Sequence, residues 1–208
     1  MKIYKDLIQG TDEWHELRKL KLTASNATAI GNNGAGLKTY VTKLILRTFI
    51  TEPEIFSKDI ERGNILEPIA RTKYEFEKGV PVYEVGFIEH CPNSGYSPDG
   101  LVDVDYKNEG PGLMEIKARN DAKHFALLQG GSVESGVQWQ MQMGMMVTGR
   151  KWCDFVSYNP NFKKNSLFVK RFYIDDTKQQ KLKLGLANGI KMLREQMKTP
   201  IVISELAA

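Results

Sequence analysis

The segment between Asp99 and Lys117 constrains the fold of this chain more than any other, because it predicts a β-hairpin with charged groups gathered at one end. Two apolar stretches flank residues 107–112, whose Asn, Pro and Gly residues are typical of a turn between antiparallel strands. On the second strand Glu115 and Lys117 are two residues apart, so their side chains point to the same face. Pairing of the strands would bring Asp99 beside both of them.

A metal site is the simplest consequence of this arrangement. The carboxylates of Asp99 and Glu115 would repel each other, and burying them uncompensated would cost several kcal/mol. Mg²⁺ prefers carboxylate oxygens, retains several waters and is bound by few protein ligands together with substrate phosphates. We therefore predict a Mg²⁺ site, for which Mn²⁺ is a substitute, held by Asp99 and Glu115 with the backbone carbonyl of Ile116 as a further ligand.

Neighbouring charged groups have roles in the same chemistry. Lys117 would orient or activate an attacking water and stabilise charge on a phosphate group. Glu67 lies in a predicted helix over residues 61–78 and would complete the ligand shell of the metal through a water. Pro68 restricts the backbone of Glu67 and would fix its direction. The predicted reaction is hydrolysis of a phosphodiester, and the predicted catalytic residues are Glu67, Asp99, Glu115 and Lys117.

A simpler interpretation of these residues is structural. Glu115 and Lys117 would then line a solvated strand face, and residues 97–100 would form only a turn. For the E-x-K pattern alone this interpretation is preferred, because short motifs match by chance. The ordered fragments around Glu67, Asp99 and Glu115, with an apolar strand carrying the charges, favour the metal site.

Several fragments occur in the order typical of a known superfamily. The chain resembles the PD-(D/E)XK nucleases and, within them, the lambda-exonuclease-like phage recombination nucleases of the viral recombinase family. The resemblance extends over roughly residues 11–175, and its order and spacing are more specific than any one fragment. The similar stretches are 14–18 (WHELR), 23–25 (TAS), 63–67 (GNILE), 97–101 (SPDGL), 113–117 (LMEIK), 138–142 (QWQMQ) and 147–148 (VT).

The resemblance implies a Mg²⁺-dependent 5′→3′ exonuclease that degrades one strand of linear double-stranded DNA to mononucleotides. The product would carry a 3′ single-stranded overhang for phage-type recombination by strand annealing. Members of the family assemble as a ring-shaped trimer around DNA, which implies a homotrimer here. They also work with a single-strand annealing protein, so a protein of that kind is an expected partner.

The family has a pocket for the terminal 5′-phosphate, which implies further site residues. A forked cation with several neutral donors suits a phosphate monoester. By resemblance the pocket residues are Arg18, Ser25, Ser97 and Gln142. Gln138 lies four residues before Gln142 on the same predicted helix face and is a second candidate. Taken singly, Arg18 is equally explained as a surface charge, Ser25 as a helix cap and Ser97 as a turn residue.

Three other charged residues are further candidates. The extra acid that the family carries on the preceding strand corresponds to Glu89, which is one methylene longer than an aspartate. Glu89 is a candidate metal ligand, with a solvated carboxylate as the alternative, so one metal or two both stay open. Arg62 and Arg119 are candidates for contacts with DNA phosphates, which give affinity without sequence specificity.

Composition excludes several classes of protein. Of the 208 residues, 41% are hydrophobic and 26% are charged, as in ordinary globular proteins, and the net charge of +4 permits DNA binding without requiring it. Two cysteines are too few for a disulfide framework, a zinc site or an iron–sulfur cluster. With no signal peptide or apolar run of membrane-spanning length, we expect a cytoplasmic protein without a membrane partner, in the host cytoplasm if a phage encodes it.

Apolar periodicity predicts an α/β protein with a restriction-endonuclease-like core, in which helices flank a central mixed β-sheet. No linker or repeat divides the chain, so a single nuclease domain is expected over residues 1–208. The predicted helices are 37–51, 61–78, 121–129, 133–147 and 177–197. In the first of them Val41, Leu44, Ile45 and Phe49 lie on one stripe. The predicted strands are 82–89, 101–104, 113–118, 152–158 and 167–174.

Two other functions would use parts of the same site. An endonuclease of the restriction or structure-specific type would share the metal ligands, and the phosphate pocket argues against it. A DNA-binding relative without catalysis would keep the fold alone, and the intact set of Asp99, Glu115 and Lys117 argues against that.

Overall fold

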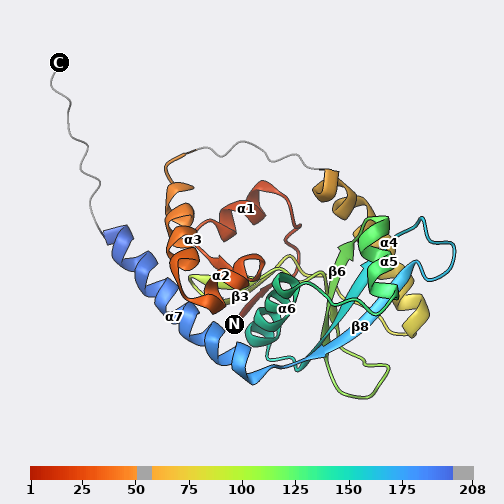
Figure 1. Ribbon diagram of the computed structural model, residues 1–208. Coiled ribbons are helices and arrows are strands. Elements are labelled where there is room, and N and C mark those ends of the chain that lie inside the picture. Colours follow the sequence, from red (N-terminus) through yellow and green to blue (C-terminus); the bar gives the residue numbers. More distant parts are fainter. Residues whose placement is uncertain (51–57, 199–208) are drawn as a thin grey trace.

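The computed structural model describes residues 1–50 and 58–198, with side chains again from residue 61 onward. Within these ranges the chain forms two four-stranded β-sheets surrounded by helices (Figure 1). The strand orders are β1-β3-β4-β2 and β5-β6-β7-β8. The predicted α/β fold class is confirmed, although the expected central sheet is divided in two. The single-domain prediction also covers residues outside the described ranges and stays a prediction.

The second sheet contains the predicted hairpin. Its strands are β5 (Gly100–Val102), β6 (Gly112–Ala118), β7 (Trp152–Tyr158) and β8 (Leu167–Tyr173). The β5–β6 and β7–β8 pairs are antiparallel, whereas β6 and β7 are parallel. A parallel pair needs a long crossover connection. Here the crossover consists of α5 (Asp121–Leu128) and α6 (Ser135–Thr148).

The first sheet leads directly into the second. Its strands are β1 (Lys2–Tyr4), β2 (Leu22–Thr23), β3 (Phe87–Cys91) and β4 (Ser94–Tyr96). Only the residues Ser97, Pro98 and Asp99 separate β4 from β5. Asp99 therefore lies where the chain passes from one sheet to the other.

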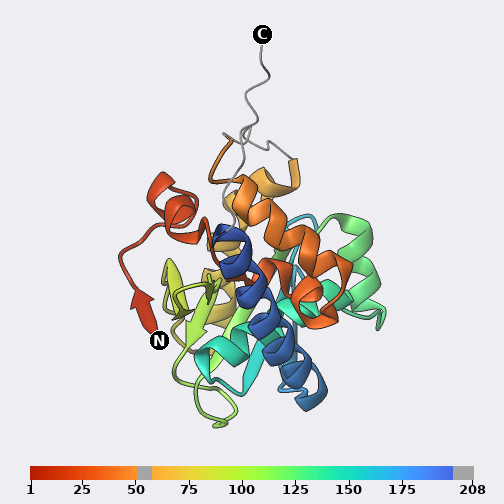
Figure 2. The same cartoon turned by 90° about the vertical axis from the view of Figure 1, so that its left-hand side faces the viewer.

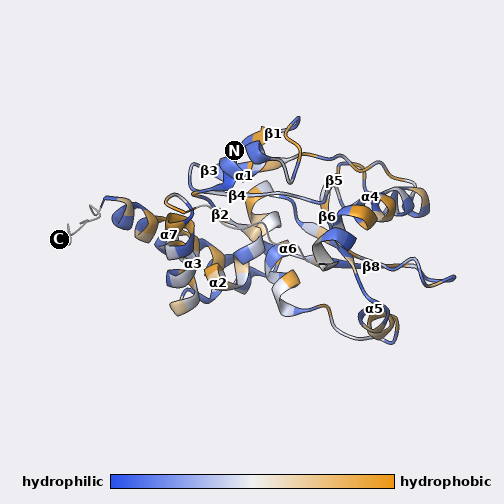
Figure 3. Ribbon diagram, turned by 90° about the horizontal axis from the view of Figure 1, so that it is seen from above, coloured by the Kyte–Doolittle hydropathy of each residue, from blue (hydrophilic) through white to orange (hydrophobic). Residues whose placement is uncertain are grey.

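Helices cover both faces of the second sheet. The long helix α4 (Lys58–Lys78) covers one face, and α5 and α6 lie on the other (Figure 3). Alternate residues of a strand point to opposite faces. Accordingly Met114 and Ile116 share a buried cluster with Tyr74 of α4, whereas Leu113 shares a cluster with Met141 of α6. The apolar strand β6 is thus buried on both sides up to its charged end.

A separate layer of helices packs on the first sheet and α6. Its members are the 3₁₀ turn η1 (Ala24–Asn26), α2 (Ala27–Asn32), α3 (Ala35–Leu46) and α7 (Asp176–Lys198). The short helix α1 (Asp12–Arg18) lies apart from this layer and is joined to the first sheet through Trp14. In Figure 2, α7 runs along α2 and α3. The approach is close at Gly185, where an added Cβ would lie 1.8 Å from the carbonyl oxygen of Ile30. No helix among the described residues has the length and apolarity needed to cross a membrane.

Two predicted elements differ from the structure. The strand expected over 82–89 begins only at Phe87, because the preceding residues form a single bridge, between Tyr83 and Leu101. The helix expected over 37–51 ends at Leu46, and Thr51 lies outside the described residues. Short hydrogen bonds of the i→i+3 kind close the end of that helix. Phe49, expected on the stripe of that helix, is consequently 59% exposed.

Two helical glycines give a matched test of the α2–α7 contact. We expect Gly185→Ala to destabilise the protein by about 1–3 kcal/mol, because the new methyl group overlaps the Ile30 carbonyl. The control is Gly136→Ala in α6, where the nearest atom to a new Cβ is 3.8 Å away. That change should stabilise by up to about 1 kcal/mol through helix propensity. Urea unfolding of both variants measures the difference, and equal effects would contradict the close contact.

Candidate active site

The Asp99 carboxylate takes the place of a strand beside β6. Strand β5 pairs with β6 only as far as Met114, which leaves the next outward-facing amide of β6 without a strand partner. Asp99 fills this position, because its Oδ2 accepts a hydrogen bond of 2.7 Å from the Ile116 N–H. Arg71 of α4 donates from Nε to the Asp99 carbonyl at 3.1 Å. Asp99 is thus fixed between β6 and α4.

The backbone of Ile116 offers a second oxygen on the same side. In a strand the N–H and C=O of one residue point in the same direction, so the Ile116 carbonyl faces the side of Asp99. This carbonyl lies between the side chains of Glu115 and Lys117 in sequence, at the end of the β5–β6 hairpin. The predicted hairpin therefore brings together one backbone and two carboxylate oxygen donors.

Glu115 is a buried acid with one close cationic partner. Its side chain is fully buried, and Lys117 Nζ lies 2.5 Å from its Oε1. The buried hydroxyl of Tyr96 donates to Glu115 Oε2 at 3.5 Å. Because β6 alternates, Glu115 and Lys117 lie on one face of the strand, as their spacing predicts.

The electrostatics follow from this burial. Loss of solvation raises the pKa of Glu115 to about 8, and repulsion by Asp99 acts in the same direction against the attraction of Lys117. Burial disfavours the Lys117 ammonium, but the carboxylates of Glu115 and Asp99 outweigh this and raise the pKa of Lys117 above its ordinary value. Lys117 is therefore a persistent cation and hydrogen-bond donor in the metal-free site.

Glu67 comes from α4 to the same place. Burial first, and then the charge of Asp99, raise the pKa of Glu67 to about 7. Gly63 is one helical turn earlier, and a Cβ there would lie 3.3 Å from Glu67 Oε1, so glycine leaves room for the carboxylate. Pro68 follows within the interior of α4, which begins earlier than predicted.

The donor set suits a hard divalent cation. Among residues 1–50 and 61–198 no group of three or more His, Cys, Asp or Glu side chains is already arranged to hold a metal ion. Mg²⁺, however, is commonly bound by one or two carboxylates and several waters. The repelling carboxylates of Asp99 and Glu115, with the Ile116 carbonyl, meet that requirement. Glu67 is close enough to interact with both carboxylates electrostatically and is suited to act through a water.

Glu89 lies apart from these residues, which corrects its prediction as a metal ligand. It is on β3 in register with Lys2 and Gly95. Its Oε2 accepts hydrogen bonds from Lys21 Nζ at 2.8 Å and from Tyr4 at 3.4 Å. The hydrogen bond from Lys21 lowers the pKa of Glu89, so this carboxylate is already compensated in a separate ion pair.

Arg18 and Ser97 are brought together through Trp14. The Trp14 indole donates to Ser97 Oγ at 3.0 Å and to the Gly86 carbonyl at 3.1 Å. The Arg18 guanidinium stacks over the Trp14 ring, 3.6 Å from its centroid. Burial lowers the pKa of Arg18 to about 10, and its buried Nε has no hydrogen-bond partner among the described residues. Ser97 is two residues from Asp99, so this pocket adjoins the carboxylates.

Trp14 was not predicted as a site residue, although its spacing from Arg18 indicates a contact between the two side chains. Trp14 and Arg18 are four residues apart in α1, the spacing at which helical side chains stack. Ser25 lies in η1 with its hydroxyl exposed and 3.0 Å from Thr23 Oγ1. The Thr23 amide donates to the Tyr40 hydroxyl, and Tyr40 acts electrostatically on Arg18. Ser25 is thus linked to Arg18 only through Thr23 and Tyr40, and its role as a phosphate ligand stays a prediction.

Gln142 does not face this pocket, which corrects its prediction as a phosphate ligand. Its Nε2 donates to the Tyr173 carbonyl at 2.7 Å, and its Oε1 accepts from Asp175 N and Gln179 Nε2, each at 3.0 Å. The side chain is buried at the junction of β8 and α7. Tyr173 is level with Trp152 at the start of β7, whereas the charged site lies toward the end of β6. Gln142 therefore has a structural role.

Another glutamine occupies the correct face of α6. A Cβ on Gly144 would lie 2.8 Å from the Tyr96 ring, and one on Gly136 would lie 3.8 Å from Thr28 Oγ1. Gln140 is midway between these glycines at four-residue spacing, so it faces the gap between α2 and Tyr96. Gln138 instead donates to the Val133 carbonyl at 2.8 Å. Helix phase, set by the two glycines, distinguishes Gln140 from its neighbours.

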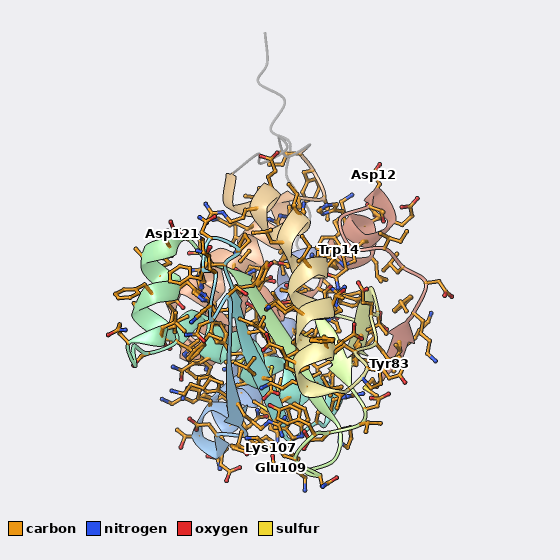
Figure 4. The ribbon with its side chains drawn as sticks, turned by 90° about the vertical axis from the view of Figure 1, so that its right-hand side faces the viewer. Asp12, Trp14, Tyr83, Lys107, Glu109 and Asp121 are labelled. Carbon is orange, nitrogen blue, oxygen red and sulfur yellow. The ribbon has the colours of Figure 1, made fainter. Side chains whose placement is uncertain are left out.

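Arg62 and Arg119 line a cleft on the other side of the carboxylates. The cleft has a volume of about 510 Å³. Figure 4 shows Asp121, at the start of α5, and Trp14, on α1, on opposite sides of α4. The residues that line the cleft are Arg62, Leu66, Arg119, Asn120, Asp121, Ala122, Asn159, Pro160 and Asn161. Two sites suited to anions thus lie on opposite sides of α4 (Figure 4).

The fold and the site define a class of protein, the PD-(D/E)XK nuclease superfamily. A family model described as a YqaJ-like viral recombinase domain matches residues 13–151, more than half of the chain. The chain therefore belongs to this viral recombinase family, which confirms the resemblance to lambda-exonuclease-like nucleases. No curated protein matches the chain.

Solved structures agree with this assignment. An alkaline exonuclease (LHK-Exo) from Laribacter hongkongensis is 34% identical, with a TM-score of 0.78 over 90% of this chain and 94% of that one. The same enzyme in complex with dAMP matches equally well. A phage-related exonuclease from Haemophilus somnus 129PT is 14% identical, with a TM-score of 0.61 over 86% of this chain and 95% of that one, and shows the shared fold alone.

The raised pKa of Glu115 predicts how pH affects the metal-free protein. A glutamate in the unfolded chain loses its proton near pH 4.5, whereas folded Glu115 retains it to about pH 8. Between these values the folded state binds more protons, so stability falls as pH rises. In chelator, the Tm of Glu115→Gln minus that of wild type should increase by at least about 2 °C from about pH 5 to about pH 8.

An exposed carboxyl provides the control for this measurement. Glu16→Gln changes a side chain that is 71% exposed and pairs with Lys19. Its Tm difference from wild type should vary much less over the same pH range. A flat profile for Glu115→Gln as well would contradict the burial of a titrating acid in the site.

Proposed function

We propose that this protein is a Mg²⁺-dependent 5′→3′ exonuclease that degrades one strand of linear double-stranded DNA to mononucleotides and leaves a 3′ overhang. The observation that carries the proposal is the junction between the Asp99 carboxylate and β6, next to buried Glu115 and Lys117. Membership of the viral recombinase family and the likeness to an alkaline exonuclease support it. Mn²⁺ is the expected substitute for Mg²⁺, because it accepts the same oxygen ligands.

Asp99, Glu115 and the Ile116 carbonyl would hold the metal, and Glu67 would act through a water. The bound metal would supply Lewis acidity toward the phosphate and lower the pKa of a bound water. Lys117 is an ammonium, so its task is to donate hydrogen bonds that orient the attacking water and stabilise charge on the phosphate. Burial of Glu115 and Tyr96 keeps this region poorly solvated, which strengthens these interactions.

Selection of a DNA end would come from the pocket beside the carboxylates. Arg18 presents a buried guanidinium nitrogen that has no partner in the described part of the chain, and Ser97 and Ser25 supply hydroxyl groups. A terminal 5′-phosphate has more charge and more acceptor oxygens than an internal phosphodiester, so it would pair best with this set. We include Gln140 as the fourth group, in place of Gln142, because of its position on α6.

The proposal extends to the biological setting expected from the family. The active form would be a ring-shaped homotrimer around duplex DNA. A single-strand annealing protein would receive the 3′ overhang during phage-type recombination. Both proposals rest on family membership, and they place the enzyme in the cytoplasm of the cell that contains the DNA.

The decisive experiment follows the fate of labelled DNA ends. Linear duplexes labelled at one 5′ end or one 3′ end are incubated with the protein and Mg²⁺, beside a closed circle and a chelator control. We expect early release of the 5′ label as a mononucleotide, an intact circle, and no reaction in chelator. Lys117→Ala should reduce the rate at least about 100-fold while DNA binding persists. Cutting of the circle would indicate an endonuclease, and inactivity with every metal would indicate a DNA-binding relative.

The Arg18 pocket predicts a preference among DNA ends. Arg18→Ala should slow digestion of 5′-phosphorylated ends by about 10- to 100-fold, because a charge-assisted hydrogen bond to the phosphate is lost. Digestion of 5′-hydroxyl ends should change by less than about threefold. Lys19→Ala, at the residue that directly follows α1, is the matched control, since Lys19 pairs with Glu16 at the surface. Equal losses on both kinds of end would remove the terminal-phosphate pocket from the proposal.

A further inference from the structure

Two arginines carry buried donors that have no acceptor. Among residues 1–50 and 61–198, Arg18 Nε and Arg119 Nε are the buried side-chain polar atoms without a hydrogen-bond partner. Native proteins rarely bury a donor in this way unless a ligand or ion satisfies it. Arg18 is on the Ser97 side of the carboxylates, whereas Arg119 follows Lys117 on the opposite side. A terminal phosphate would satisfy Arg18, and Arg119 needs a different acceptor.

Arg119 is held firmly at the end of β6. Its backbone N–H donates to the Tyr158 carbonyl at 3.0 Å, which continues the pairing of β6 with β7. Its Nη2 lies 2.6 Å from Glu134 Oε2. The arginine side chain is only 12% exposed, whereas that of Glu134 is 46% exposed. Glu134 therefore orients the guanidinium from the solvent side and leaves Nε directed elsewhere.

The cleft beside Arg119 has the chemistry of a phosphate site despite one acid. Asp121 Oδ1 accepts hydrogen bonds from Asn159 Nδ2 at 2.8 Å and from Asn161 Nδ2 at 2.9 Å. These bonds, together with the charge of Arg62, lower the pKa of Asp121 and compensate its charge. Asp121 is thus engaged by two amides, while Arg119 Nε has no acceptor among the described residues, and an oxygen of a backbone phosphodiester would supply one.

The position of the cleft also suits a contact with DNA that lies beyond the carboxylates. Glu115, Lys117 and Arg119 follow one another at two-residue spacing, so the series leads from the reacting phosphate toward the cleft. Leu66 lines the cleft and precedes Glu67. The order across the molecule is therefore the Arg18 pocket, the carboxylates, and the Arg119 cleft. DNA with its terminal phosphate at Arg18 would extend past the carboxylates to Arg119.

We propose that the cleft lined by Arg62 and Arg119 is a second phosphate site, which binds a backbone phosphodiester of the DNA beyond the scissile bond. The inference rests on the proposed function and adds the means by which the duplex is held during cutting. Arg119 supplies Nε and a forked guanidinium. Glu134 is a positioning residue that keeps this fork in place and contacts no DNA.

Equilibrium binding in chelator tests the site without catalysis. Wild type and the variants Arg119→Gln, Arg119→Lys, Glu134→Gln and Lys123→Gln are titrated with 5′-phosphorylated linear duplex over a range of salt concentrations. Arg119→Gln should weaken binding about tenfold and lower the salt slope by about one, and Arg119→Lys should weaken binding but retain the slope. Glu134→Gln should weaken binding by less than about threefold. Lys123 is exposed on α5 outside the cleft, so its variant is the charge-matched control.

A second arm identifies the phosphate. Single neutral methylphosphonates are placed beyond the scissile bond, either in the cut strand or in its complement. A methylphosphonate at one of these positions should weaken binding by wild type but not by Arg119→Gln. The strand that carries this methylphosphonate, and so shows this coupling, is the strand that Arg119 binds. Equal losses for Arg119→Gln and Glu134→Gln with unchanged slopes would assign Arg119 a structural role. Coupling in neither strand would also overturn the site.

The test separates this inference from the proposed function. Failure of wild type to digest any linear duplex would refute the exonuclease itself. Normal digestion by wild type, combined with Arg119→Gln binding that matches wild type at every salt concentration, would refute only the second phosphate site. Thermal unfolding of each variant shows whether it is folded. If Arg119→Gln is not folded, Arg119→Lys replaces it in the test, because a lysine can keep the ion pair with Glu134.

Discussion

The hydrogen bond from the Ile116 amide to Asp99 Oδ2 is the interaction on which the site depends. It joins the segment that leaves the first sheet to the middle of β6 in the second. The same contact directs the Ile116 carbonyl toward Asp99 and keeps Asp99 next to Glu115. A strand in this position would satisfy the amide equally well but would supply no charge. In place of a backbone hydrogen bond to a neighbouring strand, the Ile116 amide therefore binds the Asp99 carboxylate and fixes its position.

Charge is concentrated here at the expense of solvation. Glu115 is fully buried, and the charges of Lys117 and Arg71 do not offset the burial and mutual repulsion that raise the pKa values of Glu67 and Glu115. The negative charges of these carboxylates are poorly compensated without a bound cation and well compensated with one. A preorganised metal site is built in this way. The surrounding apolar packing of β6 between α4 and α6 makes this mismatch possible, since an open strand end would admit water.

Local sequence patterns predicted Asp99, Glu115 and Lys117 because a hairpin and a two-residue spacing fix their relation within one stretch of chain. Glu89 and Gln142 failed for a different reason. The carboxylate of Glu89 accepts a hydrogen bond from Lys21, which is 68 residues away in the sequence. The amide of Gln142 forms hydrogen bonds at the junction of β8 and α7. Neither partner is visible in the local pattern. The choice between Gln142 and Gln140 required the phase of α6, which depends on how its glycines pack.

The stacked pair of Trp14 and Arg18 has a practical consequence. The chain has three tryptophans, and Trp139 and Trp152 are buried in the core. Trp14 is the partly exposed one, with its indole nitrogen bonded to Ser97 and its ring beneath the guanidinium. Any anion that draws Arg18 from the ring changes the electronic surroundings of that indole. The protein therefore contains its own fluorophore at the entrance where DNA ends would arrive.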